Sequence, residues 1–158
     1  MLTTEREKQM LVGLTVQPFV AAAVGFVLFR VINYAGVAGD TANPVETAFG
    51  FSVLCGTAAS VVTGVIGYPG LVWVLKRSTL TRQQTLVGGL VLGNIPGALV
   101  VLALAARHLS RGMTPTLDNL TYGVPGALRL ISYGTVLGVV GAAVFWWLAG
   151  RRLNTPLP

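Results

Sequence analysis

Residues 85–106 read TLVGGLVLGNIPGALVVLALAA, and this run decides the fold class. It carries no charge, and Asn94 is its one strongly polar side chain. A bilayer core about 30 Å thick requires about 20 apolar residues at 1.5 Å rise each, so the run is long and apolar enough to cross a membrane as a helix. A buried helix of a soluble protein would carry a polar stripe at a period of 3.6 residues, and this run has none.

Three further runs meet the same length requirement. Residues 10–29 contain no charge and a single strongly polar side chain, Gln17, whereas residues 47–75 and 130–150 are uncharged throughout. We therefore predict an all-α integral membrane protein in which four transmembrane helices form an up-down bundle. The predicted spans cover residues 10–31, 47–75, 84–106 and 128–149, and residues 1–158 are predicted to form a single four-helix transmembrane domain.

The composition of the whole chain agrees with this fold class. Hydrophobic residues make up 53% of the 158 residues and charged residues only 10%, against about 25% charged residues in an ordinary soluble domain. Too few charges remain to cover the surface of a water-soluble globule. With one cysteine and one histidine, the chain has no material for a disulfide framework or a cysteine-rich zinc site, and we expect neither a metal nor a cofactor.

A cleaved signal peptide is the main alternative for the first run, because Gly36-Val37-Ala38 resembles a cleavage site. The run is longer than the apolar part of a usual signal peptide, and Glu5 and Glu7 interrupt the basic segment that should precede it. We therefore expect the first run to remain in the protein as a span.

Capping motifs precede three of the runs. They begin at Thr4, Asn43 and Thr81, and each carries Glu or Gln three positions later. In a capping box the N-cap side chain accepts a hydrogen bond from the amide three residues on, and the Glu or Gln side chain bonds back to the N-cap amide. We therefore expect these helices to begin just outside the apolar runs.

The basic residues are divided unevenly between the two sides of the predicted bundle. Seven lie on the side that holds both chain ends and the short segment between the second and third spans, and four lie on the other side. Because cytoplasmic segments are enriched in Lys and Arg, we predict that both termini are cytoplasmic and that this face attracts anionic lipid headgroups. Three tryptophans on the same side fit an aromatic belt. The seven basic residues are Arg6, Lys8, Lys76, Arg77, Arg82, Arg151 and Arg152, the four are Arg30, Arg107, Arg111 and Arg129, and the tryptophans are Trp73, Trp146 and Trp147.

Small residues recur at four-residue spacing in three of the predicted spans. In lipid, helices associate where small side chains let their backbones approach, since burying apolar side chains gives little driving force. We therefore predict that these ridges are helix contacts, either within one bundle or between copies of the chain. Four such helices should leave little internal void, so a pore would require several copies. The predicted packing residues are Gly56, Ser60 and Gly64 in the second span, Gly89, Gly93 and Gly97 in the third, and Gly134 and Gly138 in the fourth.

Three polar side chains, Gln17, Thr57 and Asn94, lie at membrane depth in the predicted spans. Counted at 1.5 Å per residue, Asn94 reaches about the depth of Thr57 and Ser60, so we expect a hydrogen bond between the third and second spans. Gln17, followed by Pro18, should likewise form an interhelical hydrogen bond beside a kink. The alternative interpretation is that these groups line a path for a solute.

A second polar group is expected at the opposite membrane face. Arg30, Glu46 and Arg129 each lie within about one turn of the end of a predicted span. They either reach separately into the headgroup region or form an ion-paired cluster that joins three spans. Such a cluster would offer a site for an anionic solute or headgroup.

No catalytic constellation accompanies these features. Ionisable side chains are absent from the depth of every predicted span, which weighs against a proton- or ion-coupled transporter. Gly50-Phe51-Ser52 is not a nucleophile elbow, and no histidine or acid lies at membrane depth to activate Ser52. Cys55 and His108 are interpreted as a buried hydrophobe and a surface residue. We therefore expect no enzymatic activity.

Two functional hypotheses follow. The first is a non-enzymatic multipass membrane protein that is accessory to a membrane complex or binds lipid, with bilayer lipids, a second copy or another membrane protein as partners. The alternative is an oligomeric passive channel or uncoupled carrier of small solutes. The basic charge is accounted for by membrane orientation, so no nucleic-acid partner is expected. Arginine at nine of the eleven basic positions is typical of GC-rich bacterial genomes, which favours a bacterial inner membrane.

Overall fold

The structure is a computed structural model that describes residues 4–34, 44–77, 79–121 and 123–153. Within these residues it is all-helical, and four helices are long and apolar enough to cross a membrane, as the sequence predicts. The first is α1 (Thr4–Tyr34) and the third is α4 (Arg82–Ser110). The second comprises α2 (Pro44–Val62), η1 (Thr63–Gly67) and α3 (Tyr68–Arg77). The fourth comprises α6 (Gly123–Phe145), η2 (Trp146–Gly150) and α7 (Arg151–Leu153). The short helix α5 (Leu117–Thr121) precedes the fourth.

Each helix extends several residues beyond its predicted span. At the start of α4 the Thr81 hydroxyl accepts a hydrogen bond from the Gln84 amide at 3.2 Å, and the Gln84 side chain accepts one from the Thr81 amide at 3.0 Å. This capping box satisfies two amides that the helix itself cannot pair. Asn43 and the Gly36-Val37-Ala38 motif lie outside the described residues, as does the side chain of Thr4.

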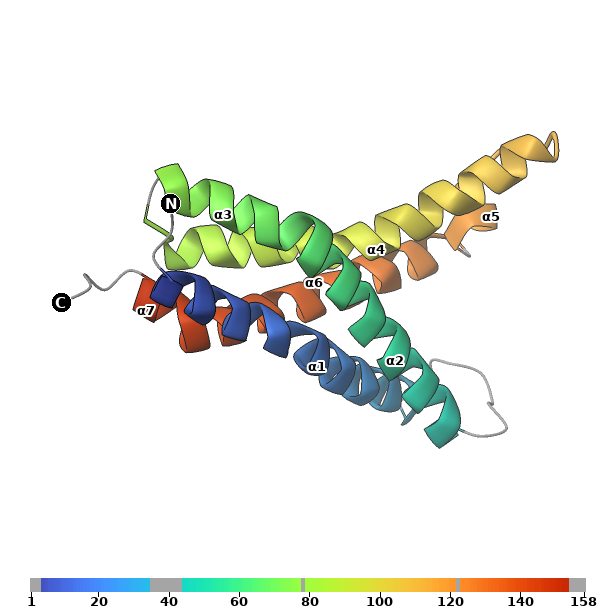
Figure 1. The fold of residues 1–158 in the computed structure, drawn as a ribbon. Coiled ribbons are helices and arrows are strands. Elements are labelled where there is room, and N and C mark those ends of the chain that lie inside the picture. Colours follow the sequence, from blue (N-terminus) through green and yellow to red (C-terminus); the bar gives the residue numbers. More distant parts are fainter. Residues whose placement is uncertain (1–3, 35–43, 78, 122, 154–158) are drawn as a thin grey trace.

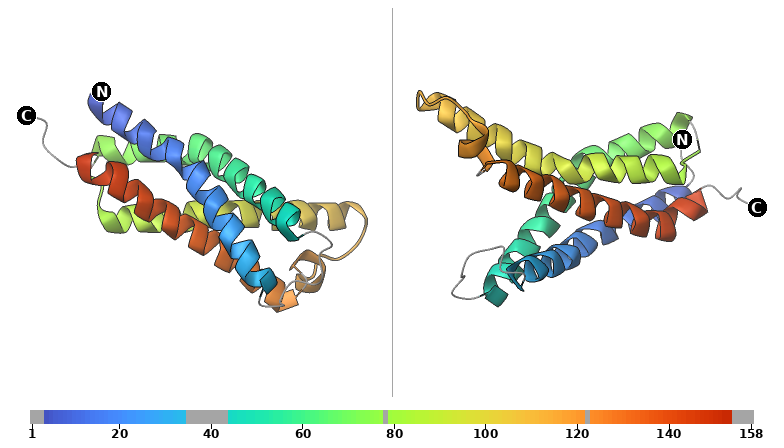
Figure 2. Two further views of the ribbon diagram at one scale, coloured as in Figure 1. Left: turned by 90° about the horizontal axis from the view of Figure 1, so that it is seen from below. Right: turned by 180° about the vertical axis from the view of Figure 1, so that it is seen from behind.

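The long helices associate as two pairs (Figure 1). Helix α1 packs along α2, and α4 packs along α6, while α1 and α6 join the two pairs and α2 meets α4 only over a small contact. The pairs converge where α1 begins and α7 ends, which we call the terminal end, and they diverge toward the opposite, distal end (Figures 1 and 2).

A π-helical segment, η1, interrupts the second long helix. The Tyr68 amide donates to the Thr63 carbonyl, five residues earlier instead of four. Pro69 follows directly and has no amide hydrogen, so the regular hydrogen-bond ladder is broken in this region. The sequence suggests that Pro69 ends or bends this overlong span. In the structure the helix continues past it as α3.

The buried core is small and lies at the terminal end. It consists of Met10 from α1, Leu80, Phe145 from α6, Ala149 from η2 and Leu153 from α7, with apolar side chains of α3 packed against it. Elsewhere the apolar surface faces outward: at most 22% of the most hydrophobic window of each long helix is buried inside the protein. A chain that exposes so much apolar helix surface requires an apolar surrounding, which a lipid bilayer provides.

Candidate functional site

The closest helix contact joins glycines of α4 and α6. A Cβ atom added at Gly93 would meet the Gly134 carbonyl oxygen and come within 2.7 Å of the Gly138 Cα. One added at Gly89 would meet the Gly138 carbonyl oxygen and the Ala142 side chain. Here the predicted ridges of the third and fourth spans face each other within a single chain, and neither position has room for a side chain.

The remaining predicted packing residues lie in looser surroundings. A Cβ atom at Gly97 would have Leu130 Cβ as its nearest neighbour, at 4.0 Å. Gly56 faces α1, where a Cβ atom would lie 3.2 Å from the Pro18 carbonyl oxygen. Gly64 has no atom within 4 Å of that position, and Ser60 is exposed, with its hydroxyl bonded to the Gly56 carbonyl in its own helix. The small-residue ridge of the second span therefore divides between a contact with α1 and an open surface.

The expected hydrogen bond from Asn94 to the second span is not formed, and this expectation was wrong. Asn94 Nδ2 donates to Thr135 Oγ1 of α6 at 3.3 Å and to the Leu90 carbonyl of its own helix at 2.9 Å. Thr57 donates to the Val53 carbonyl within α2. Since α4 packs along α6 and touches α2 only over a small contact, a shared depth does not bring Asn94 and Thr57 together. Nothing in the sequence singles out Thr135 as the partner, because the partner depends on which helix α4 packs against.

Gln17 joins the two helix pairs. Its Nε2 donates to the Gly141 carbonyl of α6 at 2.8 Å, which is an interhelical hydrogen bond of the kind expected for this residue. A Cβ atom at Gly141 would meet the Gln17 Oε1 atom, so the glycine gives the amide access to the α6 backbone. Gln17, Thr57 and Asn94 thus bond to three different places and do not line one continuous path.

Arg30, Glu46 and Arg129 do not form an ion-paired cluster. All three side chains are exposed, and among the described residues the one ion pair joins Lys8 and Glu5 at 3.3 Å. Arg30 belongs to α1, Glu46 to the first turn of α2 and Arg129 to α6, so a cluster would have to join two helix pairs that diverge toward the distal end (Figure 1). The interpretation in which each side chain reaches separately into the headgroup region agrees with this arrangement.

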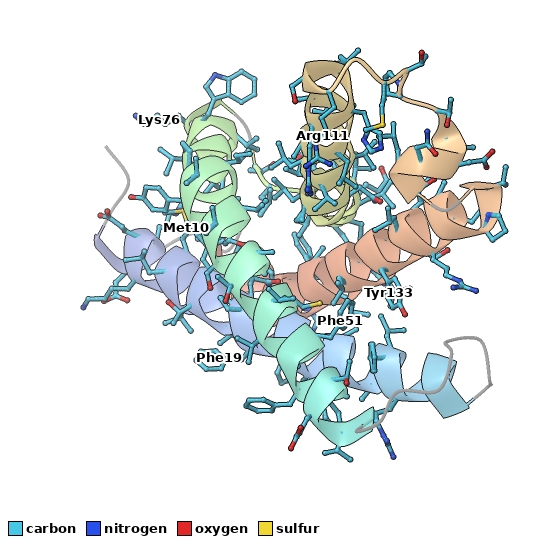
Figure 3. The ribbon with its side chains drawn as sticks, turned by 90° about the vertical axis from the view of Figure 1, so that its right-hand side faces the viewer. Met10, Phe19, Phe51, Lys76, Arg111 and Tyr133 are labelled. Atoms are coloured by element: carbon cyan, nitrogen blue, oxygen red, sulfur yellow. The ribbon has the colours of Figure 1, made fainter. Side chains whose placement is uncertain are left out.

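A large apolar crevice lies between the second long helix and α4, and its volume is about 820 Å³. This finding corrects the expectation that four helices with small-residue ridges leave little internal void. Tight glycine packing is confined to α4 and α6, whereas α2 and α3 stand away from α4 and leave space between them (Figure 3). Side chains of α1 and α6 lie behind that space, and the lining includes Leu14, Ala21, Leu54, Ala58, Ile66, Leu71, Val91, Leu92, Val100, Leu137 and Phe145.

Aromatic side chains close one part of the crevice. Phe51 of α2 lies against Tyr133 of α6 with ring centroids 5.4 Å apart, and it lies at the same centroid distance from Phe29 of α1. Phe51 and Tyr133 both line the crevice, and Figure 3 shows them close together where α2 passes α6. Such pairs add about 0.5–1.5 kcal/mol beyond the area they bury, so they strengthen the junction between the diverging pairs.

The few polar groups of the crevice are largely occupied by the protein itself. Thr85 donates its hydroxyl hydrogen to the Thr81 carbonyl at 3.0 Å, Gln84 accepts from the Thr81 amide, and Gln17 donates to Gly141. No charged side chain is among the described residues that line the space. The crevice therefore suits an apolar occupant.

Gly88 shows what sequence reasoning missed at this site. It lines the crevice, and a Cβ atom added there would have no neighbour within 4 Å. Its neighbour Gly89 faces α6 and has no free space at all. Both glycines belong to the same apolar run, and the sequence does not tell which of the two faces a helix and which faces a cavity.

The described residues contain no group of three or more His, Cys, Asp or Glu side chains that could hold a metal. His108 is half-buried, and its Nδ1 lies 2.8 Å from the Leu104 carbonyl within α4. Cys55 is a free thiol that lines the crevice and packs close to Gly25.

The chain matches no family model, no curated protein and no solved structure.

Proposed function

We propose that this protein is a non-enzymatic, four-span membrane protein that binds the acyl chain of a lipid in the crevice between α2–α3 and α4. The crevice carries this proposal, because it is large, apolar and placed between helices whose outer surfaces suit a bilayer. Its volume of about 820 Å³ falls in the range of about 300–1,000 Å³ that is common for ligand pockets. An occupant would be selected by shape and by apolar contact, since three of the few polar lining residues, Gln17, Gln84 and Thr85, already bond to the protein.

The apolar character of the crevice lining favours a lipid chain as the occupant. An acyl chain is narrow and flexible, and each methylene buried away from water contributes about 0.8 kcal/mol for a chain that leaves the aqueous phase. A role as accessory to a membrane complex remains compatible with lipid binding, because Gly64 of η1 has open space around it and is not part of the crevice lining.

A passive channel receives less support from the structure. A water-filled path requires polar groups aligned along it, and the hydrogen bonds of Gln17, Thr57 and Asn94 are directed to separate sites. The apolar lining would favour exclusion of water. We therefore propose a binding role and not conduction.

The proposed threading places the terminal end in the cytoplasm and the helices in an up-down bundle. Supporting this orientation, the segments at the terminal end contain seven of the eleven basic residues of the chain. Trp73 and Trp147 are exposed near the same end, where aromatic side chains anchor helices at the membrane interface.

Filling the crevice tests the proposed function. The substitution Gly88→Leu adds a side chain where the structure has free space, so it should occupy the crevice without disturbing the α4–α6 contact. Native mass spectrometry of the protein released from nanodiscs would count the retained phospholipids. We expect at least one retained lipid in the unsubstituted protein and a marked loss in the variant.

The matched control is Gly64→Leu, which adds the same side chain in open space outside the crevice lining. It should retain lipid as the unsubstituted protein does. Absence of retained lipid in the unsubstituted protein, or equal retention in both variants, would contradict the proposal. Retention of a polypeptide in place of lipid would favour the accessory role instead.

A further inference from the structure

Basic side chains stand at the terminal end of the crevice. The segment from the end of α3 to the start of α4 contains Lys76, Arg77 and Arg82 and no acidic residue. The side chains of Lys76 and Arg82 are exposed, and neither is in an ion pair with a described residue. Figure 3 shows Lys76 at the far end of α3. Positive charge is thus available where α3 ends and α4 begins, the two helices that border this part of the crevice.

The crevice lining extends to this charged end. Trp73 on α3 lines the crevice one turn before Lys76, and Thr85 on α4 lines it one turn after Arg82. From Gln84 to Val100, the lining follows α4 for about 24 Å at 1.5 Å per residue. The site therefore has one basic end and a long apolar body.

We infer that the occupant is an anionic phospholipid, with its phosphate near Lys76 and Arg82 and an acyl chain along α4 in the crevice. This inference rests on the proposed function and adds the class of lipid and its direction. Charge complementarity selects the headgroup. An anionic headgroup has either a second negative charge or no amine to neutralise its phosphate, so two cations attract it more strongly than they attract a zwitterionic headgroup. The uncharged lining excludes the headgroup from the interior and so sets the direction.

Lipid competition tests this inference. The protein is reconstituted in nanodiscs that contain equal amounts of phosphatidylglycerol and phosphatidylcholine, and the lipids that it retains are identified by native mass spectrometry. We expect retained phosphatidylglycerol to exceed phosphatidylcholine by about fivefold or more, since each basic residue near the surface contributes a factor of about five. The double variant Lys76→Gln/Arg82→Gln should retain the same number of lipids with little preference between them.

The control is the double variant Arg107→Gln/Arg111→Gln, which removes two exposed charges near the end of α4 at the distal end. It should keep the preference for phosphatidylglycerol. Equal retention of the two lipids by the unsubstituted protein would overturn the inference, as would an unchanged preference in Lys76→Gln/Arg82→Gln. If only this inference fails, the protein still retains lipid and Gly88→Leu still lowers the number retained. If the proposed function fails, the unsubstituted protein retains no lipid, or Gly88→Leu retains as much lipid as the unsubstituted protein.

Discussion

A single methyl group placed between α4 and α6 should destabilise the protein measurably. The substitution Gly93→Ala puts a Cβ atom against the Gly134 carbonyl oxygen and 2.7 Å from the Gly138 Cα. Carbon atoms in contact prefer separations of about 3.5–4.0 Å, so the helices must move apart by about 1 Å. Both opposing atoms belong to the α6 backbone, which cannot yield as the end of a flexible side chain can.

The expected cost follows from what that separation removes. A gap of about 0.5–1 Å forfeits roughly a quarter to a half of the attraction between each pair of touching atoms. The Asn94–Thr135 hydrogen bond, already 3.3 Å long, would be stretched beyond a useful length. Over-packing of a close-packed site typically costs about 1–3 kcal/mol, and we expect Gly93→Ala to fall in this range.

Thermal unfolding in a mild detergent measures the effect, with Gly97→Ala as the control. Gly97 is one ridge position away on the same helix, and its added Cβ would be 4.0 Å from Leu130 Cβ, an ordinary contact. In a chain of this size each kcal/mol corresponds to a shift of about 2–4 °C in the melting temperature. Gly93→Ala should lower the temperature by several degrees and Gly97→Ala should leave it nearly unchanged. Equal stability of the two variants would refute the assignment of Gly93 to a tight helix contact.

Two further predictions concern the polar bridge and the threading. A double-mutant cycle with Asn94→Leu and Thr135→Val should give a coupling free energy of about 0.6 kcal/mol, which is the average for such hydrogen bonds in membranes. Additive effects on the free energy of unfolding would show that the two side chains are not bonded. On a Cys55→Ala background, Thr114→Cys should react with an impermeant maleimide in intact cells, whereas Thr79→Cys should react only after the membrane is permeabilised. The reverse labelling pattern would invert the proposed orientation.

The features that could be predicted from the sequence depend on residues close together in the chain. The apolar runs predict four long helices because span length and hydrophobicity belong to each segment alone. The capping box at Thr81 was predictable for the same reason, since its partner Gln84 is three residues away. Even so, the sequence of residues 47–75 did not indicate a π-helical segment at Thr63–Gly67. Pro69 indicated only that the helix ends or bends near that position.

The partners of the polar side chains could not be predicted by counting depth. Asn94 and Thr57 lie at comparable depth by residue count, yet Asn94 bonds to Thr135 on α6. Depth in the membrane limits which residues can be hydrogen-bond partners, but the rotation of each helix about its axis decides which neighbouring helix a side chain faces. The same argument applies to Gln17, for which an interhelical bond was expected but not its acceptor, the Gly141 carbonyl.

The sequence by itself determined that this protein is helical, that it has four helices able to cross a membrane, and that seven of its eleven basic residues fall near the chain ends and between the second and third apolar runs. Only the tertiary structure decided that α4 packs on α6, that α2 stands away from α4, and that Gly88 and Gly89 face a cavity and a helix respectively. The physical reason lies in the two kinds of interaction. Preference for lipid over water is a property of each segment taken alone, whereas association of helices within lipid depends on how closely two particular surfaces fit.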